Sequence, residues 1–147
     1  MRILIANDKF KGSLPAEKAG LNLKNSLETV FPGAFFDLCP IADGGEGTAL
    51  AMTTALAGEW VSETTQDAHG RPHQAPFGWV SGSATAIMEM SAASGLAIVQ
   101  DIELNPFKAS TLGTGILIQS ALRRGARRIL IGIGGSATND GAVSYTH

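Results

Sequence analysis

Residues 2–39 read RILIANDKFKGSLPAEKAGLNLKNSLETVFPGAFFDLC and carry the pattern of a strand, a helix and a second strand. The apolar run Arg2–Ala6 predicts a strand buried on both faces, as in a parallel sheet. Pro15 then opens a helix, and Gly33 follows its end. One face of that helix is apolar, at Ala16, Ala19, Leu23, Leu27 and Val30. Residues 34–39 complete a βαβ unit with parallel strands.

The rest of the chain alternates between helical and strand-like segments. Residues 48–57 and 113–124 predict helices, while residues 59–65, 74–80, 84–90 and 128–133 predict strands. Turn residues separate the first three of these strands, so we expect them to form an antiparallel section. The predicted class is therefore α/β, with a partly parallel sheet, an antiparallel section, and Gly-rich loops at the carboxyl ends of strands.

Composition narrows the classes of function. The 147 residues favour one domain, and a net charge of −2 does not favour a nucleic-acid partner. The single cysteine, Cys39, excludes an internal disulfide, and we expect its side chain to be buried at a strand end. No apolar run approaches the ~18 residues of a membrane span, so we expect a cytoplasmic protein without a membrane partner. The oligomeric state stays open.

The segment GIGGSATNDG, residues 132–141, follows the last predicted strand and resembles an anion-binding loop. Its glycines let the backbone approach a ligand closely, and successive amides can hold phosphate oxygens. Ser136 and Thr138 add hydroxyl donors, and Asp140 adds a carboxylate beside them. A tight structural turn is the alternative. The spacing Gly132-x-Gly134-x-x-Ala137 also matches a dinucleotide fingerprint, which leaves a dinucleotide-dependent oxidoreductase as a further alternative.

Two other loops carry charged side chains where strands end. Asp43 and Glu46 lie three residues apart at a predicted helix start, where they can hold Mg²⁺ or position a hydroxylated substrate. Capping of that helix is the alternative interpretation. Asp8, Lys9 and Lys11 follow the first strand, and lysines there can neutralise phosphate charge. For this loop the alternative is a solvated surface segment.

Several blocks, in the same order along the chain, resemble the bacterial-type glycerate kinases. They are IANDKFKGSL at residues 5–14, PIADGGEGT at 40–48, MEMSAASGL at 88–96 and IGIGGSATNDG at 131–141. The resemblance implies two α/β domains with a cleft between them, and transfer of the ATP γ-phosphoryl group, with Mg²⁺, to a hydroxyl of D-glycerate. The implied product is 2-phosphoglycerate.

The resemblance covers almost the whole chain but less than half of a family member. Residues 142–147 do not fit the family pattern. We therefore expect a truncated, N-terminal part of a glycerate kinase that is inactive alone.

The resemblance also implies roles for the loop residues, because phosphoryl transfer depends mostly on positioning and charge stabilisation. Asp140 or Asp8 would accept the hydroxyl proton, and Lys11 would balance phosphate charge. Binding of phosphate or substrate would fall to Gly134, Gly135, Ser136, Thr138, Asn139, Gly44 and Gly45, and binding of Mg²⁺ to Asp43 and Glu46. A noncatalytic nucleotide- or anion-binding α/β module is the alternative function.

Overall fold

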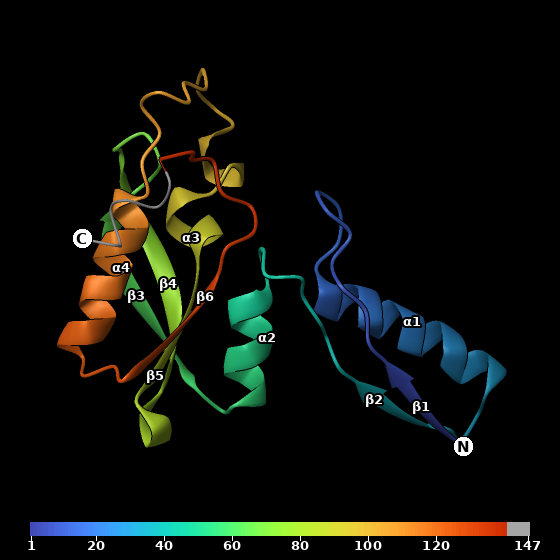
Figure 1. Ribbon diagram of the computed structural model, residues 1–147. Coiled ribbons are helices and arrows are strands. Elements are labelled where there is room, and N and C mark those ends of the chain that lie inside the picture. Colours follow the sequence, from blue (N-terminus) through green and yellow to red (C-terminus); the bar gives the residue numbers. More distant parts are fainter. Residues whose placement is uncertain (141–147) are drawn as a thin grey trace. The chain divides into compact units, whose positions relative to one another are not determined.

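The computed structural model describes residues 1–140 and divides the chain into two compact units (Figure 1). The first unit is Met1–Asp43 and the second is Gly44–His147, of which residues 44–140 are described. None of the helices in this described part combines the length and the apolar character needed to cross a bilayer. Each unit has its own arrangement of strands and helices.

The first unit is the βαβ element that the sequence predicts. Strand β1 (Arg2–Ile5) and strand β2 (Phe35–Leu38) are parallel, and helix α1 (Ala16–Val30) connects them. The register aligns Arg2 with Phe35 and Ile5 with Leu38. Helix α1 ends one turn before Gly33, whose φ of 79° suits glycine in the turn into β2.

Helix α1 packs on one face of this two-stranded sheet. A Cβ on Gly20 would lie 3.7 Å from both Ile5 Cγ2 and Leu38 Cδ2, which places the helix directly over that face. Leu4 points to the opposite face and is 64% exposed, so the expectation that β1 is buried on both faces is wrong. The reason is that one helix in this unit can cover only one side of the sheet.

Other predicted core positions of the first unit also lie at the surface. The buried stripe of α1 is centred on Ala19 and Gly20, while Leu23 and Val30 are exposed. Cys39 is exposed as well, contrary to expectation. Spacing correctly predicts the helix, but the width of its buried stripe depends on how much sheet is present to cover it.

The second unit contains a four-stranded sheet with the order β3-β4-β5-β6. Strand β4 (Pro72–Val80) pairs antiparallel with both β3 (Glu59–Gln66) and β5 (Thr85–Glu89). Strand β6 (Arg128–Gly132) pairs parallel with β5. The predicted antiparallel section is therefore present, and it shares its sheet with the parallel pair β5 and β6. Short 3₁₀ turns follow β4 at Ser81–Ser83 and precede the long loop to α4 at Ala97–Val99.

Helices cover both faces of this sheet (Figure 1). Helix α4 (Leu112–Arg123) packs Leu117 against Phe77 and Met88, and these side chains form the main core. Helix α2 (Thr48–Ala55) lies on the opposite face, where Gly78 faces Thr53. Successive strand residues point to opposite sides, so Phe77 and Gly78 serve different helices. A short helix, α3 (Met90–Ser94), follows β5 directly.

Candidate functional site

The parallel strands β5 and β6 end at the same edge of the sheet, because Glu89 is the register partner of Gly132. In α/β proteins this edge is the usual place for ligands. The segment that follows each strand contacts the other there. Leu96 N donates a hydrogen bond to Gly135 O at 2.9 Å, and Ala137 N donates to Ser94 O at 2.8 Å. These bonds hold residues 133–140, the second glycine loop, against the end of α3.

Residues 44–47, the first glycine loop, pack backbone to backbone against the second. Gly134 N donates to Gly44 O at 2.8 Å. A Cβ on Gly134 would lie 2.8 Å from the N and Cα atoms of Gly45, and a Cβ on Gly132 would lie 2.6 Å from Gly44 O. Side chains at either position would force the loops apart. The glycines therefore have a structural reason to be present, beside the ligand approach that the sequence suggested.

We expect Gly134→Ala to lower the free energy of unfolding of the second unit by about 1–3 kcal/mol, because its Cβ meets immobile backbone. Gly82→Ala is the matched control, since its Cβ meets no atom within 4 Å. Urea unfolding of both variants measures the difference. Equal stabilities would mean that the two loops separate easily.

The second glycine loop presents polar groups beyond those that fix it. Ser136 Oγ lies 2.8 Å from Thr138 Oγ1 and accepts a hydrogen bond from Thr138 N at 3.1 Å. Together with the bonds above, these contacts use the amides of Gly134, Ala137 and Thr138. They do not use the amides of Gly135 and Ser136, two successive backbone donors. Such a pair, with Gly135 at a φ of 75°, is the kind of backbone that can bind an oxyanion.

Asp140 lies at the end of this loop and connects it to helix α4. Its Oδ2 accepts hydrogen bonds from Thr111 N at 2.7 Å and from Thr111 Oγ1 at 3.0 Å. Thr111 is the N-cap residue of α4 and is fully buried. The carboxylate thus anchors the start of a core helix, a role that the sequence did not predict. This contact is compatible with a second role for Asp140 toward a substrate.

The remaining predicted acidic and basic residues are divided between the two units. In the first unit, Asp8 Oδ1 accepts a hydrogen bond from Lys9 N at 2.6 Å, Lys9 Nζ lies 3.8 Å from Asp43 Oδ1, and Lys11 is exposed. In the second unit, a Cβ on Gly135 would lie 2.8 Å from Glu46 Oε1, so the Glu46 carboxylate lies against the second glycine loop. Residues 1–140 contain no group of three or more His, Cys, Asp or Glu side chains arranged to hold a metal ion.

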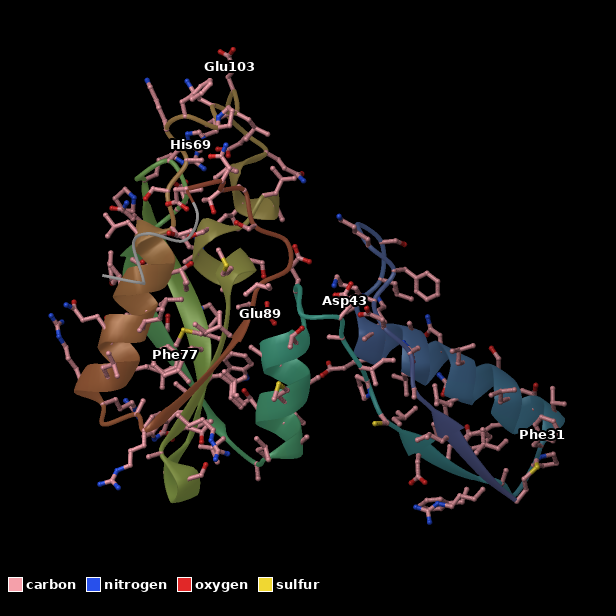
Figure 2. All side chains as sticks on the ribbon, in the orientation of Figure 1. Phe31, Asp43, His69, Phe77, Glu89 and Glu103 are labelled. Carbon is pink, nitrogen blue, oxygen red and sulfur yellow. The ribbon has the colours of Figure 1, made fainter. Side chains whose placement is uncertain are left out.

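Glu89 is a polar residue of this region that the sequence analysis did not single out. Its side chain is buried at the end of β5, and it accepts hydrogen bonds from Ala49 N at 2.6 Å and from Ser91 Oγ at 3.1 Å. Figure 2 shows it between the sheet and the start of α2. An acidic residue directly after the apolar run 86–88 is the signal that would have found it, because a buried carboxylate needs specific partners.

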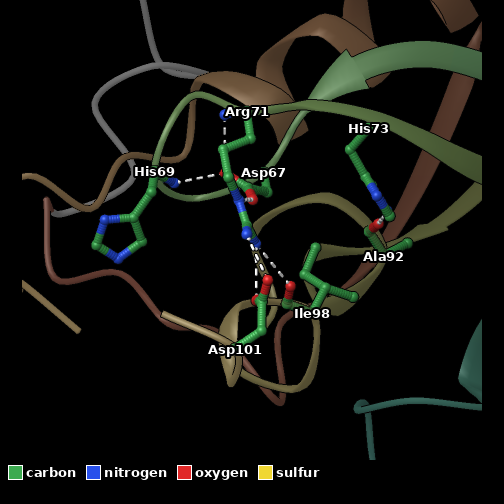
Figure 3. Close-up of polar contacts among 7 residues, drawn as sticks. All are labelled: Asp67, His69, Arg71, His73, Ala92, Ile98 and Asp101. Atoms are coloured by element: carbon green, nitrogen blue, oxygen red, sulfur yellow. Dashed lines mark hydrogen bonds and ion pairs between the residues drawn. The ribbon is translucent and has the colours of Figure 1, made fainter. Parts of the chain in front are cut away.

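The turn between β3 and β4 supports the segment beside the second glycine loop. Asp67 is buried and accepts hydrogen bonds from the amides of His69 and Arg71 and from Arg71 Nε (Figure 3). The Arg71 guanidinium also donates to both carboxylate oxygens of Asp101 and to Ile98 O. Arg71 therefore holds the segment around Ile98, which follows the Leu96 contact to the second glycine loop.

This cluster predicts how stability depends on pH. Burial raises the pKa of the Asp67 carboxyl, but hydrogen bonds from the Arg71 side chain and from the amides of Arg71 and His69 outweigh burial and leave that pKa below its usual value. The Arg71 side chain likewise lowers the pKa of Asp101. Carboxyls with lowered pKa values stabilise the fold above about pH 4. They lose that contribution as the pH falls through their pKa in the folded state.

We therefore expect the free energy of unfolding to fall as the pH is lowered below about 4. The Arg71→Leu variant should be less stable at pH 7, and its free energy of unfolding should fall less on acidification. Urea unfolding at a series of pH values measures both. Lys24→Leu is the control, because it removes a partly exposed ion pair with Glu28 on α1. An unchanged pH profile in Arg71→Leu would contradict the assignment.

The fold and the site define a class of protein. Glycine-rich loops with backbone donors, hydroxyls and carboxylates gather at the carboxyl ends of parallel strands, as in α/β proteins that bind phosphorylated ligands. The family model described as the glycerate kinase family matches residues 3–146. The chain belongs to the glycerate kinase family.

Relatives with the same description are similar over nearly the whole chain. Glycerate kinase of Bacillus subtilis (strain 168) is 46% identical over 143 residues, which are 97% of this chain and 37% of the relative. Glycerate 2-kinase of Escherichia coli (strain K12) is 42% identical over 97% of this chain and 38% of the relative. A crystal structure from Salmonella typhimurium LT2, of a protein assigned as glycerate kinase 2, has a TM-score of 0.80 and 41% identity, with 99% and 39% covered. The chain thus spans little more than a third of these relatives, in agreement with the expected match to part of a family member.

Proposed function

We propose that this chain forms part of a cytoplasmic kinase that transfers the ATP γ-phosphoryl group to a hydroxyl of D-glycerate and releases 2-phosphoglycerate and ADP. The observation that carries the proposal is the second glycine loop, which presents the successive amides of Gly135 and Ser136 at the edge where β5 and β6 end. Membership of the glycerate kinase family supports the choice of substrate. The name of the E. coli relative supports the 2-position.

The reaction needs an oxyanion site and a proton acceptor. In our proposal, the Gly135 and Ser136 amides hold phosphate or the substrate carboxylate, and the Ser136, Thr138 and Asn139 side chains add donors. Gly44, Gly45 and Gly134 keep the loops in register. Asp140 or Asp8 accepts the proton as the substrate oxygen bonds to phosphorus and the bond to ADP breaks. Lys11 balances phosphate charge.

We also propose Mg²⁺ as the cofactor that accompanies ATP, held by Asp43 and Glu46. Carboxylate oxygens suit this ion, which usually takes only one or two protein carboxylates and completes its shell with water and phosphate. The ion would neutralise charge on the transferred phosphoryl group.

The metal proposal predicts that Asp43→Asn raises the Mg²⁺ concentration needed for half-maximal activity roughly 10-fold or more, since loss of a carboxylate weakens a metal site. Asp37→Asn is the matched control, because Asp37 pairs with Arg2 on the exposed sheet face of the same unit. The measurement is the rate of ADP formation at a series of Mg²⁺ concentrations, in a hybrid kinase that carries this chain and is described in the next paragraph. Equal Mg²⁺ dependence in both variants and the parent would contradict the assignment of Asp43 as a metal ligand.

A hybrid kinase tests the function. In it, this chain replaces the matched 37% of B. subtilis glycerate kinase. We expect ADP formation from MgATP that depends on D-glycerate, and a 2-phosphoglycerate signal in ³¹P spectra. The parent enzyme is the positive control, and the hybrid without glycerate measures background ATP hydrolysis. A hybrid that unfolds cooperatively but forms no glycerate-dependent ADP would contradict the proposal.

A further inference from the structure

Glu89 contacts elements that lead to both glycine loops. It ends β5, its residue is 8% exposed, and its two carboxylate oxygens accept from different partners. Oε1 accepts from Ala49 N, in the first turn of α2, at 2.6 Å. Oε2 accepts from Ser91 Oγ, in α3, at 3.1 Å. A buried carboxylate that satisfies two separate donors restrains the segments that carry them.

The contact with α2 fixes the first glycine loop. The N-cap of α2 is Gly47, which has no side chain that can accept a hydrogen bond. The next residue, Thr48, uses its Oγ1 to accept from Gly44 N at 3.0 Å, within the loop. The start of α2 therefore has no side-chain cap of its own. Glu89, at the end of β5, supplies the oxygen that accepts a hydrogen bond from the first turn of the helix.

The contact with Ser91 leads to the second glycine loop. The Ser91 Cβ would lie 3.1 Å from a Cβ built on Gly135, so this side chain packs directly against the loop backbone. Glu89 holds the Ser91 hydroxyl and thereby the rotamer that faces Gly135. Through its two oxygens, one carboxylate is connected to the segments whose backbones meet at the bond from Gly134 N to Gly44 O.

We propose that Glu89 is a positioning residue that sets the separation of the two glycine loops and so places the Gly135 and Ser136 amides for phosphoryl transfer. This inference rests on the proposed kinase function. Glu89 acts through Ala49 and Ser91, so its hydrogen-bond acceptors matter and its negative charge does not. That distinction separates it from a proton acceptor or a metal ligand, for which the charge is essential.

The test compares Glu89→Gln with Glu89→Ala in the hybrid kinase. A glutamine can accept from Ala49 N and donate to Ser91 Oγ, so we expect its kcat to stay within about 5-fold of the parent. Alanine removes both acceptors, and displaced loops should lower kcat per folded molecule roughly 10²-fold. If the Gln variant loses as much activity as the Ala variant, the charge itself acts and the inference is wrong.

Further variants keep the outcome clear. Ser91→Ala removes only the contact to Oε2 and should lower kcat less than Glu89→Ala; it replaces that variant if Glu89→Ala does not fold. Glu63→Ala is the matched control, since Glu63 accepts from Ser120 in α4 rather than from a residue next to a glycine loop. Parental activity in Glu89→Ala or, where that variant does not fold, in Ser91→Ala would overturn the inference.

A second measurement separates this inference from the proposed function. In the 147-residue chain, hydrogen exchange at the Ala49 amide should stay slow in Glu89→Gln and become fast in Glu89→Ala. Equal exchange in the two variants would overturn the positioning role even if the hybrid is active. A hybrid kinase that is inactive without any Glu89 substitution would instead count against the kinase proposal. The exchange comparison would still decide whether Glu89 positions the first glycine loop.

Discussion

We expect Asp140→Asn to lower kcat of the hybrid kinase by roughly 10²–10⁴-fold with little change in KM for ATP, the usual cost of losing a proton acceptor. The amide that replaces the carboxylate cannot accept the substrate proton at neutral pH. Its oxygen can still accept from Thr111 N and Thr111 Oγ1, now 2.7 and 3.0 Å from Asp140 Oδ2. The anchor of α4 should therefore survive while proton transfer fails.

Thr111→Val is the matched control for this experiment. It removes the hydroxyl donor to Asp140 but keeps the amide, so it should cost about 1 kcal/mol of stability and change kcat only slightly. Steady-state kinetics and thermal unfolding of both variants separate the two roles. Turnover at the parental level in Asp140→Asn would restrict this carboxylate to its structural contact with helix α4.

The largest loss of stability should come from Gly113→Ala. A Cβ at this position would lie 1.9 Å from the carbonyl oxygen of Gln66 in β3 and 3.3 Å from Thr65 Oγ1. Thr65 Oγ1 also donates to Gly113 O at 2.7 Å, so the helix cannot retreat without losing that bond. Alanine favours a helix by at most about 1 kcal/mol over glycine. The clash dominates, and we expect a loss of about 3 kcal/mol or more.

Urea unfolding followed by tryptophan fluorescence measures this loss, because Trp60 and Trp79 both lie in the second unit. Gly82→Ala is again the reference, since its Cβ has open space. A Gly113→Ala variant as stable as the reference would show that α4 can move away from β3 without cost.

Periodicity and turn residues were sufficient to predict most elements of the fold. A helix expected at 113–124 is α4 at Leu112–Arg123, ending before Gly125 with its φ of 93°. The parallel pairing of β1 with β2 also follows from sequence, because a helix of 15 residues between two short apolar runs favours a crossover. These features are local, so a single stretch of chain contains the information.

Burial and side-chain partners were harder to predict, because they depend on segments distant in sequence. Leu4 has an apolar side chain typical of a core residue, but it is exposed because α1 covers the other face of the sheet. The contact of Glu89 with Ala49 spans 40 residues, and no spacing rule reveals it. The loops were identified from their glycines, but the reason for Gly134 emerged only from its contact with Gly45.

The meeting of the two glycine loops has a consequence for how such proteins diversify. Where Gly134 meets Gly45, the contact is made by backbone alone. Random drift at exposed side chains such as Asn139 can then alter what the surface recognises without disturbing its scaffold. Directed evolution of substrate preference should accordingly accumulate changes at those side chains, while the glycines at the crossing stay fixed in every active descendant.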